Sequence, residues 1–90
     1  MQQAPNESDV IRPKWYRARS MRSLGVAVRD ARETRGLTQD ELADLISSSR
    51  PTLSRLERGA SVSAETVLEA LARCGYEMVV VPRGSQVTVS

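Results

Sequence analysis

Residues 37–59, with the sequence LTQDELADLISSSRPTLSRLERG, decide how the rest of the chain is interpreted. Thr38 followed three positions later by Glu41 matches the T-x-x-E capping box, in which each residue satisfies a backbone N–H at a helix start. Acidic residues directly after Thr38 also suit the positive end of a helix dipole. A helix is therefore predicted over about residues 39–46.

The second half of this stretch predicts a turn and another helix. Ser47–Ser49 favour a turn, and the last of these serines is suited to cap the helix that follows. Pro51 lacks a backbone N–H and is tolerated only in the first turn of a helix, which places the start near Arg50. Gly59 ends this helix. Two short helices joined by a tight turn are a helix-turn-helix candidate, although unrelated proteins also contain such corners.

Two further helices are predicted on either side. Residues 20–35 begin at Ser20 or Ser23, residues 64–74 follow Ser63, and each segment ends before a glycine. Apolar residues recur at steps of three and four in both segments, which assigns to the inward faces Leu24, Val28, Ala31, Val67, Leu68, Leu71 and Ala72.

The hydrophobic period changes after these helices. From Tyr76 to Val81 the sequence YEMVVV alternates with a period of two, which predicts a β-strand ended by Pro82. A lone strand has unpaired edges and needs a partner. Three arrangements remain open: pairing with the same strand of a second chain, folding onto the chain's own helices, or a hairpin with residues 86–90.

Positive charge is concentrated before the helices. Residues 12–22 contain no acid and five basic residues: Arg12, Lys14, Arg17, Arg19 and Arg22. This pattern suits a basic arm joined to a folded body, with residues 1–11 disordered or loosely held. Trp15 and Tyr16 allow two interpretations. The arm lies along phosphates or enters a minor groove with one of them as an anchor, or both aromatic rings pack on the body.

The composition excludes several classes of function. The chain has no His and a single Cys, Cys74, so an internal disulfide and a His/Cys zinc site are both excluded. No nucleophile–base pair is evident either, so we expect no catalytic residue, no metal, no cofactor and no enzyme activity. No apolar run has the length of a membrane span and no signal region is evident, so a cytoplasmic location without a membrane partner is expected.

The pattern L-T-Q-x-E-L-A, then a turn, then S-R-x-T-L-S-R-L-E-R-G resembles the lambda-repressor-like family, also called Xre/Cro-type helix-turn-helix domains. The resemblance covers roughly residues 24–71. It implies an all-α, four- to five-helix DNA-binding domain over residues 20–75, with the helix-turn-helix at 39–58. Residues 1–19 are then a flexible basic arm, and residues 76–90 a dimerisation strand and tail.

The resemblance also implies which residues contact DNA. Gln39 would bond a phosphate and brace the recognition helix, while Arg50 and Arg55 would reach base edges in the major groove, where the arginine fork matches guanine. The alternative is that these arginines form an ordinary solvated helix face. The DNA-binding set implied is Thr38, Gln39, Ser49, Arg50, Pro51, Thr52, Ser54, Arg55 and Arg58.

Glu57 looks like a surface acid, but in the resembling family the equivalent residue pairs with an arginine of the first helix. Arg32 matches that place, so an Arg32–Glu57 ion pair is predicted. The sequence departs from the family in its turn, where Ser47 and Ser48 replace a glycine and an apolar residue. Ser47 would therefore have to accept a left-handed backbone, or the turn would differ slightly.

The ending L-x-x-x-G-Y-E-M-V-V-V resembles the HipB-type antitoxins and their solitary relatives. That resemblance implies a homodimer with an intermolecular sheet on a palindromic double-stranded DNA operator, and repression of the protein's own operon. The alternative function is that of an antitoxin that neutralises a HipA-like kinase toxin by direct binding. The sheet would be built from Tyr76, Met78, Val79, Val80 and Val81.

Overall fold

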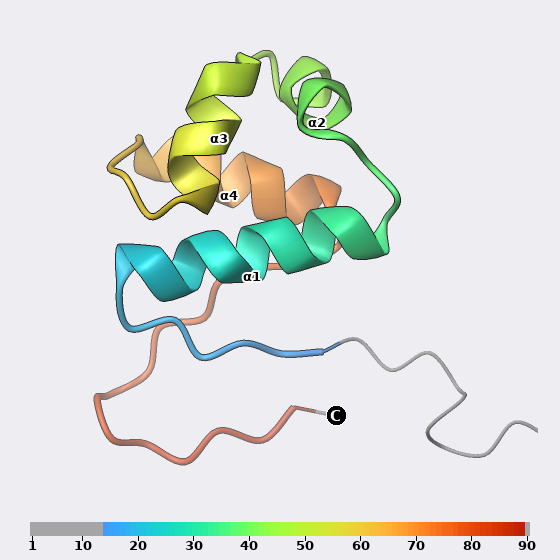
Figure 1. The fold of residues 1–90 in the computed structure, drawn as a ribbon. Helices are drawn as coiled ribbons and strands as arrows, with labels where there is room; N and C mark the ends of the chain where they lie inside the picture. The colour runs from blue at the N-terminus through green and yellow to red at the C-terminus, as the bar shows by residue number, and fades with distance from the viewer. Residues whose placement is uncertain (1–13, 90) are drawn as a thin grey trace, which may run out of the picture.

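The computed structural model describes residues 14–89, so the first thirteen residues of the predicted arm lie outside the described part. The described part is helical and contains no β-strand (Figure 1). None of its helices is long and apolar enough to cross a membrane. In chain order the helices are α1 (Met21–Thr34), α2 (Gln39–Leu45), α3 (Arg50–Glu57) and α4 (Ala64–Arg73).

Local sequence explains where each helix begins. In every case the residue before the helix is a serine or threonine whose side-chain oxygen accepts a hydrogen bond from the backbone N–H three positions on. The cap residue of α1 is Ser20, one of the two predicted alternatives, and the other caps are the predicted Thr38, Ser49 and Ser63. Thr38 and Glu41 form the predicted capping box, with the Thr38 N–H donating to Glu41 Oε1 at 2.8 Å.

The core lies where the four helices meet. All four helices contribute buried side chains, and α4 with its C-cap residue closes the core with Val67, Ala70, Leu71 and Cys74. The predicted inward positions Leu68 and Ala72 are wrong, because both are exposed, Leu68 by 50%. The buried stripe of α4 is one helix face wide, and these two residues lie beside it. The largest fully buried side chains are Leu42, Leu53, Leu56 and Val28.

α1 and α3 approach each other backbone to backbone at Gly25. A Cβ atom at this position would meet the carbonyl oxygen of Leu56 and lie 2.8 Å from that of Glu57. Gly25 is buried, and only a residue without a side chain fits there. The glycine that weakens α1 as an isolated helix is therefore what allows α3 to pack closely on it.

The chain after α4 forms no strand within the described residues. Tyr76 donates its backbone N–H to the Leu71 carbonyl at 2.8 Å and is half-buried, after which Met78–Val81 are exposed. A turn with Ser85 N–H bonded to the Pro82 carbonyl at 3.1 Å follows, and no hairpin forms with the tail through Val89. A strand requires a neighbouring strand for its hydrogen bonds, and the described part of a single chain supplies none to this segment.

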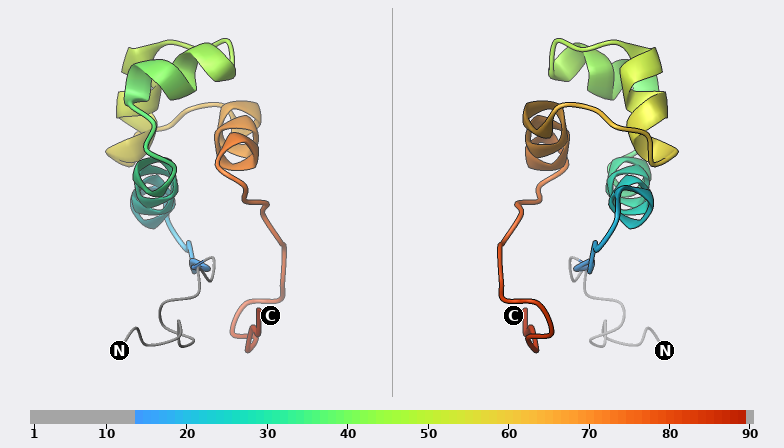
Figure 2. Two further views of the ribbon diagram at one scale, coloured as in Figure 1. Left: turned by 90° about the vertical axis from the view of Figure 1, so that its right-hand side faces the viewer. Right: turned by 90° about the vertical axis from the view of Figure 1, so that its left-hand side faces the viewer.

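The described part of the arm, Lys14–Arg19, runs along the side of α1 that faces away from α2 and α3 (Figure 1). Viewed from the side, the arm lies beneath α1 and the C-terminal segment lies beneath α4 (Figure 2). The arm is held by Tyr16, whose hydroxyl donates to the Asp30 carboxylate and whose ring lies 5.7 Å from that of Tyr76. Of the two interpretations of the aromatic residues, packing on the body is the one that Tyr16 adopts.

Candidate nucleic-acid interface

The turn between α2 and α3 sets the direction of α3. Ser47 has a φ of +53°, the left-handed conformation that the sequence required if the turn kept its usual shape. The Ser48 N–H donates to the Ala43 carbonyl at 2.8 Å, which closes the end of α2. Ser49 then caps α3, and its hydroxyl lies 2.9 Å from that of Thr52. The two serines therefore form a compact turn without the glycine, at the cost of one strained residue.

Most of the predicted contact residues lie on the exposed surface of α2 and α3. Ser49, Arg50, Pro51, Arg55 and Arg58 are exposed, and Thr38 is exposed at the start of α2. The remaining members of the set, Gln39, Thr52 and Ser54, are half-buried. These residues lie on α2 and α3, which are on the opposite side of α1 from the arm (Figure 1).

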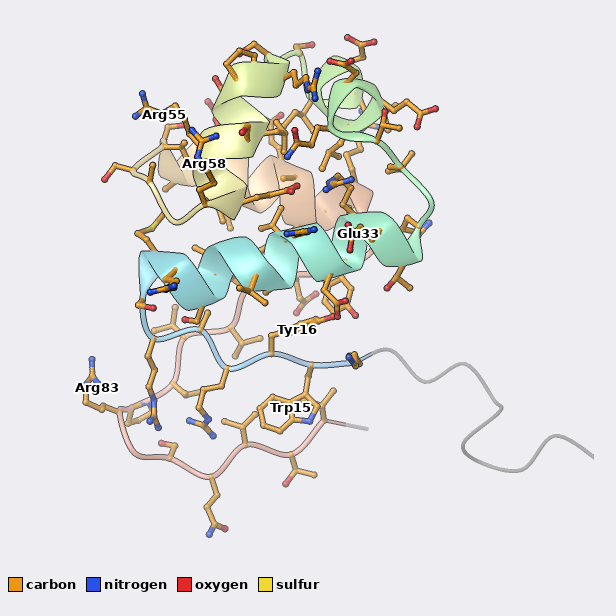
Figure 3. All side chains as sticks on the ribbon, viewed as in Figure 1. Trp15, Tyr16, Glu33, Arg55, Arg58 and Arg83 are labelled. Atoms are coloured by element: carbon orange, nitrogen blue, oxygen red, sulfur yellow. The ribbon has the colours of Figure 1, made fainter. Side chains whose placement is uncertain are left out.

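Two of the predicted arginines are engaged with their own surroundings. Arg55 donates from Nη2 to the carbonyl oxygen of Ser61 at 3.1 Å, and Arg58 donates from Nη1 to Ser54 Oγ at 2.6 Å. Figure 3 shows Arg55 on the side of α3 away from α2, with Arg58 near the end of the helix. Both hydrogen bonds are exposed and each contributes only about 0.5–1.5 kcal/mol, so either side chain can leave its partner for another acceptor.

A single carboxylate joins the three helices beneath this surface. Glu57 of α3 accepts two hydrogen bonds from Arg32 of α1, Nε to Oε2 at 2.6 Å and Nη2 to Oε1 at 2.8 Å. Gln39 of α2 donates to Glu57 Oε1 at 3.0 Å. The side chains of Arg32 and Glu57 are only 10% and 4% exposed, so Glu57 is not a surface acid.

Arg32 also fixes the connection between α1 and α2. Its Nη1 donates to the Leu37 carbonyl at 2.8 Å. The hydrogen bonds to Glu57 raise the pKa of Arg32 above its ordinary value, and the nearby carboxylate charge acts in the same direction. Because α1, the α1–α2 link, α2 and α3 all meet at this ion pair, it sets how the outer face of α3 is presented.

Sequence reasoning missed two residues that shape this surface. Ser61, in the loop after α3, supplies the carbonyl that holds Arg55, and nothing in the sequence pattern indicates that contact. Gly25 sets how closely α3 packs on α1, and its only signal was a glycine inside an otherwise helical segment. Gln39 contacts Glu57 through its amide, which is the bracing half of its predicted role.

The comparisons with known proteins agree with this architecture. A family model described as a helix-turn-helix domain matches residues 23–77. Two crystal structures of the clp gene regulator ClgR from Corynebacterium glutamicum are similar to the chain, each at 36% sequence identity and a TM-score of 0.59 over 63% of this chain. The match spans 62% of one ClgR chain and 74% of the other. The comparison with curated proteins gave no match.

Proposed function

The chain belongs to the helix-turn-helix domain family, and on that premise we propose that it is a sequence-specific DNA-binding transcriptional regulator. The observation that carries the proposal is the exposed arginine face of α3 above the buried Arg32–Glu57 pair. The arginine fork matches the O6 and N7 atoms of guanine in the major groove, so a rigidly held α3 presents suitable groups for base recognition. The similarity to a protein described as a gene regulator supports the same role.

The contacts divide into two kinds. Arg50 and Arg55 contact base edges, and Pro51 offers an apolar contact to a thymine methyl group. Phosphates are contacted by Thr38 at the start of α2 and by the second N–H of the Gln39 amide, the first being engaged by Glu57. The remaining contacts to the DNA backbone come from Ser49, Thr52, Ser54 and Arg58. Phosphate contacts fix the position on the duplex, whereas base contacts determine the sequence that is bound.

The protein acts as a homodimer on a palindromic operator, and it represses its own operon by occupying that site. A second copy supplies the neighbour that Tyr76–Val81 lacks, so that the two segments pair as an intermolecular sheet of the HipB type. The exposed Met78–Val81 run supports this arrangement, since Val79 is 70% exposed and Val80 is 97% exposed. Two α3 helices then enter successive major grooves about 34–36 Å apart.

In the alternative role, that of an antitoxin for a HipA-like kinase, a different face of the molecule binds the partner. The cations Lys14, Arg17 and Arg19 are exposed on the side of α1 away from α3, where a protein partner can bind while α3 is on DNA. Co-purification of a second protein from the native host decides this role. A chain that purifies alone under the same conditions is a stand-alone regulator.

Selection of bound sites from random DNA, with purified protein at a fixed low salt, tests the main proposal. We expect an inverted repeat whose half-sites are centred about 10–10.5 base pairs apart, or a multiple of that spacing. Repeating the selection with Arg55→Ala should leave the half-site spacing intact and relax one base position. Recovery of unrelated sequences without a repeat would contradict sequence-specific binding by a dimer.

A further inference from the structure

A groove of 780 Å³ separates the arm from the C-terminal segment. The arm, Lys14–Arg19, forms one wall and the residues from Tyr76 to Val89 form the other, while Leu24, Ala27 and Leu71 of α1 and α4 line its floor. The two extended segments that line the groove lie on the side of the molecule opposite α2 and α3 (Figure 2). The groove therefore remains accessible when α3 is occupied.

Both walls present backbone groups that are unpaired among residues 14–89. From Glu77 to Val81 no backbone–backbone hydrogen bond is formed within that range, and the same holds for Lys14–Arg19, where only the Arg19 N–H is engaged, by Ser23 Oγ. Extended segments of this kind are templates for an added strand. Within the C-terminal wall, Met78–Val81 form a continuous run of exposed apolar side chains, which a protein surface rarely carries without a partner.

The distance between the two walls is set by Tyr16. Its hydroxyl is bonded to Asp30 on α1, where Lys14 Nζ also lies 3.5 Å from the same carboxylate. Its ring lies 5.7 Å from that of Tyr76, at the start of the other wall. Two tyrosine side chains thus lie between the backbones, which keeps the walls apart rather than paired with each other. At the far end, Arg17 donates to the Ser85 carbonyl at 3.4 Å.

We propose that this groove receives the C-terminal segment of a second copy of the chain. The inference rests on the proposed dimer and extends it from two strands to four. The sheet order is the arm of one copy, the partner's segment, the first copy's own segment, and the partner's arm. This order is closed under two-fold symmetry, because each copy's Tyr76–Val81 lies between its counterpart and the other copy's arm.

Charge selects this occupant. The segment Tyr76–Val81 would extend about 20 Å as a strand, and the described residues of the arm, Lys14–Arg19, line the other wall of the groove. The described arm carries three cations and no acid, so two arms facing each other repel. The C-terminal segment carries a single acid, Glu77, which lies beside the cations of the opposite arm in the proposed order.

Disulfide cross-linking between two variants, each with one introduced cysteine, tests the proposed order of the four strands directly. One preparation carries Trp15→Cys and the other carries Val79→Cys, Val80→Cys or Val81→Cys, and the two are mixed without DNA and oxidised. Cys74 stays in place because it is buried, and the unmodified chain is the blank. Asp44→Cys, exposed on α2 at the opposite side of the molecule, replaces Trp15→Cys in the matched control.

We expect a mixed cross-link between Trp15→Cys and at least one C-terminal variant, at a yield at least tenfold above that of the Asp44→Cys control. Self-linking of the C-terminal variants without a mixed product would overturn the four-stranded order and leave the two-stranded dimer standing. Absence of every cross-link would contradict the dimer face as well. The cross-linking experiment contains no DNA. Its outcome is therefore independent of whether the protein binds DNA in the site-selection experiment.

Sedimentation equilibrium supplies a second measurement. Tyr16→Ala removes the contacts to Asp30 and Tyr76, so we expect the dimer dissociation constant to rise at least tenfold. Arg29→Ala, on α1 but outside the groove, is the control and should leave it unchanged. Circular dichroism on both variants verifies that the helices are intact. A Tyr16→Ala protein with native helices and an unchanged dissociation constant would exclude the arm from the interface.

Discussion

Gly25 of α1 and Leu56 of α3 meet through their backbones, because a Cβ atom at position 25 would collide with the Leu56 carbonyl oxygen. The contact brings the first helix against the helix that carries the exposed arginines. Because of this contact, whether a substitution at Gly25 stabilises or destabilises the fold tests the packing of α1 on α3.

Gly25→Ala should destabilise the fold by about 1–3 kcal/mol, as forced overpacking does. In an unpacked helix the same change would stabilise by roughly 1 kcal/mol, because alanine is the better helix former. Urea denaturation, followed by circular dichroism, shows whether the free energy of unfolding falls or rises. A more stable variant would show that α1 and α3 do not approach at this point.

Glu57→Gln should destabilise the protein by about 3–5 kcal/mol, because Arg32 is left as a poorly solvated charge without a counter-charge. Arg29→Ala, which breaks the exposed Arg29–Glu33 pair of 3.3 Å, is the control and should cost no more than about 1 kcal/mol. The double variant Arg32→Met/Glu57→Leu should recover much of the loss. Equal effects of Glu57→Gln and Arg29→Ala in denaturation would contradict the burial of the pair.

Ser47→Gly should stabilise the protein by up to about 1 kcal/mol. The left-handed backbone of Ser47 costs roughly 1–2 kcal/mol for a residue with a side chain, while glycine loses about 0.5–1 kcal/mol in extra chain entropy. Ser61→Gly, in a loop residue without positive φ, should give no gain. Thermal denaturation of both variants checks the difference, and a destabilised Ser47→Gly would show that the side chain contributes more than the strain.

Arg55→Ala should weaken binding to the selected operator by about 1–3 kcal/mol and relax specificity at one base position. The hydrogen bond from Arg55 to Ser61 is exposed and weak, so little energy opposes its exchange for a base edge. Gel-shift titration at a stated salt measures the effect, with the exposed Arg73→Ala of α4 as the control. Unchanged binding by Arg55→Ala would remove Arg55 from the contact set.

Tyr16 should ionise only above the ordinary pKa of tyrosine, which is 10.0, because burial and the hydrogen bond to Asp30 both raise its pKa. The raised pKa means that arm docking contributes stability below pH 10 and loses it as pH rises through that pKa. With Tyr76→Phe, Tyr16 is the remaining tyrosine of the chain's two, and near-ultraviolet absorbance follows its titration. Adding Asp30→Asn should lower the midpoint, and a midpoint at the ordinary value with Asp30 present would contradict the contact.

Helix starts were predictable because capping is local chemistry. Thr38 and Glu41, or Ser49 and Thr52, lie three positions apart and satisfy backbone groups within one turn, so sequence neighbours suffice. The left-handed backbone of Ser47 was one of two alternatives that the resemblance to a family left open, the other being a different turn. The Arg32–Glu57 pair, 25 positions apart, was expected only through resemblance to a family.

Contacts between distant segments were not predictable in this way. Leu68 lies outside the core although its spacing suits a buried stripe, because the width of the buried face depends on what packs against α4. Tyr16 docks on Asp30, and Arg55 on Ser61, through pairings for which neither residue's neighbours supply a signal. The Tyr76–Val81 strand is absent from the described single chain because its hydrogen bonds require another strand.

By itself, then, the sequence determined the four helices, the turn between α2 and α3, and the polar outer face of α3. These depend on capping, backbone conformation and hydrophobic period, which act over a few residues. Only the tertiary structure decided how closely α3 packs on α1 at Gly25, how Glu57 joins three helices, and that the arm lies opposite α3. Those features arise from excluded volume and desolvation between segments far apart in the chain, which no local pattern encodes.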